Sequence, residues 1–241
     1  MSGHSHAKTV AATKMANAEK RGKIFSKYGR LIAIAVKDGG GSGDPATNSK
    51  LKAVIEQAKS VNMPKENIER AIKKGTGELA GETLTAVSYE GFGPGGIALI
   101  IDGITDNPNR TLGEIRAILN KNNGKLAGEG AVRWMFDKKG VIVVTPGTTP
   151  KEELEMAAIE AGAEDVKWPK DSMEVYTKPE DLESVKKSLE AKGLKIESAS
   201  QDLVPKEEVA LSEKEKAQAQ WLFEELDDND AINNVYSNMK D

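Results

Sequence analysis

The first third of the chain spaces its apolar residues as an amphipathic helix does. They follow one another at intervals of one, three, three, one, three and one: Ile24, Phe25, Tyr28, Leu31, Ile32, Ala35 and Val36. These intervals line one face of a helix. The glycine-rich stretch GGGSGDP then ends the helix, and a second apolar face follows within residues 51–58. The segment NMPKENIERAIKKG predicts a third, short helix with Pro64 in its first turn and Gly75 at its end. Residues 1–77 therefore predict a small helical bundle.

Beyond residue 77 the period of the apolar positions changes. Two runs rich in β-branched residues, LTAVSYEG and GIALIIDGIT, are separated by FGPGG and predict a β-hairpin. The segment NPNRTLGEIRAILNKNNG predicts a helix, and GAVRWMF predicts a further strand.

Residues 136–205 predict a strand, helix, strand, strand, helix and strand, which is the ferredoxin-like order. The tail predicts one helix and one strand, which complete the α+β pattern begun at residue 78. We therefore expect a multidomain α+β protein with a basic helical domain at 1–77, an α+β domain formed by 78–135 plus 206–241, and a ferredoxin-like domain at 136–205 inserted into it.

The composition excludes some classes of chemistry and indicates the compartment of the protein. It has 241 residues, 38% of them hydrophobic, and no cysteine, so disulfide and thiolate chemistry are excluded. No apolar run approaches the ~20 residues that span a bilayer, and the first residues lack the apolar core of a secretory signal. We expect a monomer without membrane attachment in the cytoplasm, or in the mitochondrial matrix as a mature form.

Charge is distributed very unevenly along the chain. The net charge is -4, yet residues 1–77 carry +9 and the remainder carries −13. Between Met1 and Lys37 the one acidic residue is Glu19, whereas an ordinary surface helix mixes both signs. This asymmetry predicts that the helical domain binds a polyanion. Aromatic residues are too sparse for a single-strand stacking platform and no recognition-helix pattern is present, which favours the backbone of structured RNA.

The residues predicted to bind nucleic acid form three groups. An N-terminal arm carries His4, Lys8 and Lys14; the polar face of the first helix carries Lys20, Arg21, Lys23, Lys27 and Arg30; the last helix carries Lys65, Arg70, Lys73 and Lys74.

The hairpin turn GFGPGG matches the dinucleotide fingerprint G-x-G-x-x-G in letters alone. That fingerprint must open a helix, so that its amides meet a pyrophosphate, whereas here a strand follows and Pro94 removes one amide. A glycine-rich turn is the main interpretation, and an exposed contact surface is the alternative. The second contact would comprise Tyr89, Phe92, Gly93, Gly95, Gly96 and Arg110.

Signatures of an enzyme are missing from the sequence. The patterns GxxxxGK[ST], HExxH and GxSxG do not occur, and the two imidazoles, His4 and His6, both lie in the N-terminal arm. Two histidines make half a metal site. We therefore predict no catalytic residue, no metal, no cofactor and no enzymatic activity.

Several motifs together resemble those of the YebC family, which includes the mitochondrial translational activator of cytochrome oxidase subunit one. They are GHS at the start, KRGKIFSK, GDP, NMPKENIERAIKKGTG, YEGFGPGG, NRT, FDKKGVI and LDDNDAINNVYSN. The resemblance implies a helical domain with two α+β domains. It also implies a ribosome-associated translation factor that binds ribosomal RNA and helps synthesis through difficult stretches such as proline runs. Because many members carry the label of transcriptional regulator, sequence-specific binding to promoter DNA is the alternative.

One departure from the family pattern affects the N-terminal arm. The family usually has Lys-Trp after GHS, whereas His6 and Ala7 stand here, so a role of that tryptophan does not carry over. The positions that match the family motifs are His4, Lys20, Arg21, Lys23, Lys27, Pro64, Lys65, Tyr89, Gly91, Gly93, Pro94, Gly95, Gly96, Asn109 and Arg110.

Overall fold

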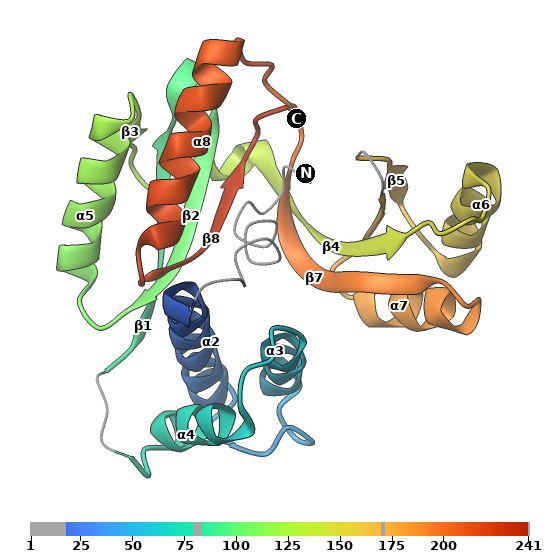
Figure 1. Ribbon diagram of the computed structural model, residues 1–241, viewed down its shortest axis with the longest axis horizontal. Helices are drawn as coiled ribbons and strands as arrows, with labels where there is room; N and C mark the ends of the chain where they lie inside the picture. The colour runs from blue at the N-terminus through green and yellow to red at the C-terminus, as the bar shows by residue number, and fades with distance from the viewer. Residues whose placement is uncertain (1–17, 80–82, 170–171, 241) are drawn as a thin grey trace. The chain divides into compact units, whose positions relative to one another are not determined.

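The computed structural model describes residues 18–79, 83–169 and 172–240 (Figure 1). Contacts between Cα atoms divide them into two compact units, one of residues 18–133 with 211–235 and the other of 134–210 with 236–240. Helices and antiparallel sheets are both present, so the α+β class is confirmed. None of the described helices has the length and apolar character needed to cross a membrane.

The predicted helical bundle opens the first unit. It consists of α2 (Ala18–Asp38), α3 (Ser49–Ser60) and α4 (Lys65–Thr76). Their apolar faces meet in one core that includes Ile32, Val36, Leu51 and Ile68. The apolar positions of α2 are therefore buried against the other two helices, as the sequence pattern predicts.

The end of α4 differs from the sequence prediction. Gly75 does not end the helix, which continues to Thr76 and stops at Gly77 in the left-handed conformation, φ 84°. Gly75 instead lies where α4 crosses α2: a Cβ at this position would be 2.7 Å from Val36 Cβ and 2.8 Å from the Ala33 carbonyl oxygen. Its missing side chain therefore allows close helix packing.

The sheet of the first unit contains β1 (Thr85–Phe92), β2 (Ala98–Thr105), β3 (Lys125–Leu126) and β8 (Ile232–Ser237), in the order β3-β1-β2-β8. The predicted hairpin is confirmed, since β1 and β2 are antiparallel neighbours joined through the 3-10 turn η1 (Pro94–Gly96). Gly95 and Gly96 have φ 67° and 79°, a region that favours glycine. Helices α5 (Pro108–Lys121) and α8 (Glu213–Asp228) lie side by side over this sheet (Figure 1).

The strand predicted at GAVRWMF is wrong. Residues 133–135 form the 3-10 helix η2 (Arg133–Met135), and the next strand, β4 (Phe136–Thr145), begins only at Phe136. The cause is the buried carboxylate of Glu90, which accepts hydrogen bonds from the amides of Gly130, Val132 and Arg133 at 2.9, 2.7 and 3.0 Å. These amides are therefore not available to a sheet ladder.

The second unit carries the predicted ferredoxin-like order of elements. They are β4 (Phe136–Thr145), α6 (Lys151–Ala161), β5 (Asp165–Lys167), β6 (Met173–Thr177), α7 (Leu182–Ala191) and β7 (Lys195–Pro205). The strands form an antiparallel sheet in the order β5-β6-β4-β7. Leu154, Val175 and Val185 are among the residues of its core.

Candidate nucleic-acid interface

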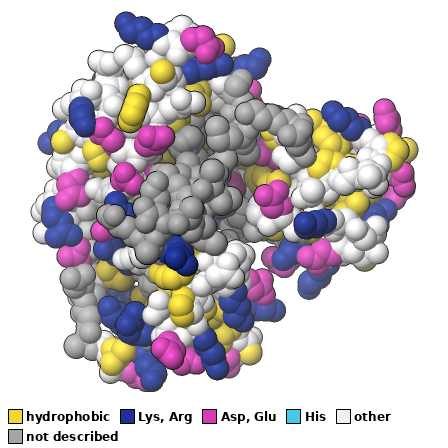
Figure 2. Space-filling model, in the orientation of Figure 1, with side chains coloured by type: hydrophobic (Ala, Val, Ile, Leu, Met, Phe, Trp, Pro, Cys, Tyr) yellow, Lys and Arg dark blue, Asp and Glu magenta, His cyan; other side chains and the backbone are white. Residues whose placement is uncertain are grey.

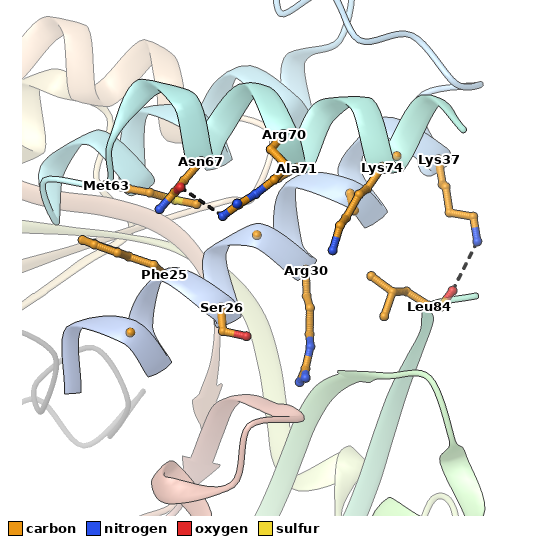
Figure 3. Close-up of a pocket in the computed structure, with 14 residues that line it drawn as sticks. Phe25, Ser26, Arg30, Lys37, Met63, Asn67, Arg70, Ala71, Lys74 and Leu84 are labelled. Carbon is orange, nitrogen blue, oxygen red and sulfur yellow. Dashed lines mark hydrogen bonds between the residues drawn. The ribbon is translucent and has the colours of Figure 1, made fainter. Parts of the chain in front are cut away.

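A groove of about 600 Å³ lies between α2 and α4 in the helical part of the first unit (Figure 3). Its α2 wall is built from Gly22, Ser26, Gly29 and Ala33, whose spacing of four, three and four residues places them on one helix face. All four side chains are small or missing. The groove therefore exists because this stripe of α2 does not fill the space beside α4.

Cations surround the groove. Four basic residues line it, Arg30 and Lys37 from α2 and Arg70 and Lys74 from α4, and none of the described residues that line it is Asp or Glu. Figure 3 shows Lys74 extending from α4 toward the α2 side. In the space-filling view, Lys and Arg side chains are spread over the helical part at the bottom of the picture (Figure 2). A concave surface lined by one sign of charge concentrates counter-ions, here anions.

Three of the four basic residues also make hydrogen bonds within the protein. Lys37 Nζ donates to the Leu84 carbonyl oxygen at 3.3 Å, and Arg30 donates to the Asp230 carbonyl oxygen. On α4, Arg70 donates to the amide oxygen of Asn67 at 3.0 Å. A guanidinium has five N–H donors, so one such bond leaves Arg70 free to contact an anion as well.

Several of the basic residues predicted on the polar face of α2 contact acidic or carbonyl groups of the protein itself. Lys27 Nζ lies 2.5 Å from the Asp227 carbonyl oxygen and 3.2 Å from its carboxylate, with 14% and 18% of the two side chains exposed. Lys23 lies 3.8 Å from the Asp228 carboxylate. Together with Arg30, these cations meet the C-terminal end of α8, where the helix dipole favours positive charge. Lys23, Lys27 and Arg30 are thus engaged within the protein.

The other predicted residues of this domain are distributed as follows. Arg21 is exposed and does not line the groove. On α4, Lys65 and Lys73 are exposed outside the groove, and Lys65 lies 3.6 Å from Glu69. Only Arg70 and Lys74 of that cluster enter the groove. The side chain of Lys20 and the arm residues His4, Lys8 and Lys14 lie outside the described residues.

The predicted second contact is not brought together as one surface. Tyr89 and Phe92 point to opposite faces of β1. Tyr89 donates to the Pro108 carbonyl oxygen at 3.1 Å, and Arg110 is paired with Asp106 at 2.6 Å and with Glu114 at 3.7 Å.

The hairpin glycines have a structural role of their own. Gly93 is buried, and a Cβ on Gly95 would lie 2.3 Å from a Leu211 methyl carbon. Gly96 adopts a positive φ as well, so these positions are explained by the turn and by its packing against α8. Their contact with nucleic acid stays a prediction.

Sequence reasoning missed part of the groove. The apolar spacing assigns Phe25 to the core alone and gives Met63 and Asn67 no role in binding, yet all three line the groove. The signal that could have located them is the pair Gly22 and Gly29, seven residues apart inside a long helix, where glycine costs roughly 1 kcal/mol relative to alanine. Within the described part of the chain, no group of three His, Asp or Glu side chains could hold a metal ion.

Comparison with known proteins gives consistent matches over the chain. Residues 5–78 match the model of the TACO1/YebC protein N-terminal domain, and residues 84–239 match that of the TACO1/YebC second and third domain. A probable transcriptional regulatory protein of Caldanaerobacter subterraneus is 47% identical over 241 residues, covering 100% of this chain and 98% of that protein. A similarly named protein of Thermoanaerobacter pseudethanolicus is 45% identical, covering 100% and 97%. The crystal structure of a conserved hypothetical protein from Aquifex aeolicus has a TM-score of 0.85 at 41% identity, covering 95% of this chain and 93% of the other.

Proposed function

Because the chain belongs to the TACO1/YebC family, we propose that it is a non-enzymatic, ribosome-associated translation factor that binds ribosomal RNA through its basic helical domain. It acts as a monomer in the cytoplasm, without a cofactor, and assists synthesis of difficult sequences such as proline runs. Any effect on rate comes from stabilising a productive ribosome conformation, because a ligand shifts an equilibrium by its differential affinity for the two states.

The observation that carries this proposal is the charge of the groove. Arg30, Lys37, Arg70 and Lys74 line it, and in the part of the chain that the structure describes no acidic residue does. A recess lined by four basic residues fits a ligand with several negative charges, and a phosphate backbone carries such charges. Arg70 adds a planar guanidinium, which matches phosphate geometry better than a point charge does.

The shape of this surface favours folded RNA over a duplex DNA site. Base readout in the DNA major groove requires a protruding helix or ribbon that enters the groove. Here the cations surround a recess, and the exposed side of α4 carries Glu66 and Glu69 beside its lysines. A recess receives a protruding strand or loop, which RNA folds supply.

The second candidate function is sequence-specific regulation of transcription. It is supported by the names of the relatives, which are called probable transcriptional regulatory proteins. This function requires a preference for promoter sequence over random duplex DNA, whereas RNA backbone binding does not.

The test is a competition experiment with the full chain and a labelled ribosomal RNA fragment, in which random duplex DNA and a pool of promoter duplexes serve as competitors. Co-sedimentation with ribosomes and translation of a reporter with and without a proline run complete it. We expect ribosome co-sedimentation, weak competition by both DNAs, and a benefit confined to the proline reporter. Selective competition by promoter DNA, without ribosome association, would favour the second function and overturn the first.

A further inference from the structure

The groove between α2 and α4 has an apolar floor beneath its charged rim. Met63 and Ala71 line it and are only 6% and 5% exposed, and the partly buried ring of Phe25 lies beside Met63 (Figure 3). A phosphate backbone alone has no apolar group to place on such a floor. The floor therefore points to a ligand that combines negative charge with a flat apolar surface.

The space above this floor is open. A Cβ added at Gly22 would meet no atom of the described residues within 4 Å, and one added at Gly29 would first reach Ala71 Cβ at 4.0 Å. The groove volume of about 600 Å³ lies within the roughly 300–1,000 Å³ that small-molecule sites occupy. The recess is therefore large enough for a single nucleotide.

Polar groups in the groove match the remaining parts of a nucleotide. Arg70 and Lys74 lie one helical turn apart on the α4 wall, so both cations are on the same side of the groove and can contact one ligand. Asn67 lines the same wall and carries an amide that can both donate and accept hydrogen bonds. Charge, a hydrogen-bonding amide and an aromatic ring thus converge on one recess.

We propose that this groove binds one unpaired nucleotide that protrudes from a folded RNA. Its base stacks on Phe25 and lies on the apolar floor, and its flanking phosphates contact Arg70 and Lys74. This inference rests on the proposed function and goes beyond it, because it names the form of RNA that the groove selects. Bulges and loops offer such bases, whereas a continuous duplex keeps them stacked inside.

The test compares two RNA hairpins that differ by one bulged adenosine. The variant Gly22→Leu fills the groove without changing its charge. Gly113→Leu is its matched control, because Gly113 also lies inside a helix, in α5, and an added Cβ there would have no atom of the described ranges within 4 Å. Leucine raises helix propensity at both sites, and thermal melting verifies that both variants fold. We expect wild type and Gly113→Leu to bind the bulged hairpin roughly tenfold tighter than the paired one, as for one stacked base.

In Gly22→Leu this preference should fall to within about twofold. The variant Phe25→Leu should also lower the preference, because it removes the ring and keeps an apolar side chain. Equal binding of both hairpins by wild type would overturn the nucleotide site and leave the proposed function standing. Equal loss of affinity for both hairpins in Gly22→Leu would overturn it too. Absence of RNA binding by wild type would overturn the proposed function itself.

Discussion

Replacing Glu90 with glutamine should destabilise the first unit, because this carboxylate organises the loop that leads to β4. Glu90 is 5% exposed. One of its oxygens accepts the Gly130 amide at 2.9 Å, and the other accepts the amides of Val132 and Arg133 at 2.7 and 3.0 Å. In glutamine one of the two oxygens becomes an NH2 group, which cannot accept a hydrogen bond.

The size of the effect follows from the hydrogen bonds that glutamine cannot make. The best orientation of the glutamine amide keeps the bonds to Val132 and Arg133 and gives up the bond to Gly130. A hydrogen bond to a charged group contributes roughly 1.5–3 kcal/mol. The Arg133 guanidinium, 3.8 Å away and half exposed, adds little. We therefore expect a decrease of about 2–3 kcal/mol in the free energy of unfolding at pH 7.

The same contacts give the effect a definite pH dependence. Burial alone would raise the pKa of Glu90, but the three backbone amides and Arg133 outweigh burial and lower it below its ordinary value. An unfolded glutamate titrates at about pH 4.3. The stabilisation is therefore complete above that pH and is lost as pH falls through the lowered pKa of the folded state.

The assay is urea unfolding of wild type and Glu90→Gln at several pH values, with hydrogen exchange at the Gly130 and Val132 amides. The control is Glu213→Gln, whose side chain is 93% exposed and lies 3.6 Å from Lys216 in the first turn of α8, so that its replacement should cost at most about 1 kcal/mol at any pH. We expect the difference between wild type and Glu90→Gln to shrink in acid. A difference that stays constant down to pH 2.5, or is absent at pH 7, would refute the reasoning.

Two further predictions concern α2. Gly75→Ala should lower the melting temperature and decrease the free energy of unfolding by about 1–3 kcal/mol, because the new Cβ would lie 2.7 Å from Val36 Cβ and 2.8 Å from the Ala33 carbonyl oxygen. A rise in melting temperature, as expected from helix propensity alone, would contradict the close packing. A double-mutant cycle of Lys27→Met and Asp227→Asn should give a coupling of about 0.5–3 kcal/mol in urea unfolding, since this ion pair is mostly buried. A coupling of zero would show that the pair contributes nothing to stability.

Much of the fold was predictable because its signals are local. The burial of Ile32 and Val36 follows from apolar spacing on α2, and the hairpin between β1 and β2 follows from two β-branched runs around a glycine-rich turn. The ferredoxin-like sheet order agrees with a simple succession of elements. Each of these features depends on residues that are close together in the sequence.

The errors arose where distant residues decide the structure. The segment GAVRWMF has the composition of a strand, yet Glu90, some 40 positions earlier, binds its amides. Lys27 is likewise engaged by Asp227, 200 residues away, which the sequence pattern does not indicate; its contact with RNA stays a prediction. Charge reversal at Lys27 would therefore place two carboxylates together and disturb the fold, so Arg70 and Lys74 are the better positions for a binding test.

The most direct test of the groove as a nucleic-acid interface is the salt dependence of RNA affinity. It compares wild type with Arg70→Glu/Lys74→Glu and with the control Lys52→Glu/Lys59→Glu, whose exposed lysines lie on α3 in the same domain but outside the groove. We predict that the slope of log K against log salt falls by about 1.4–1.8 in the groove variant, because two phosphates are no longer neutralised, and stays near the wild-type value in the control. An unchanged slope in the groove variant, or an equal fall in both, would contradict the account.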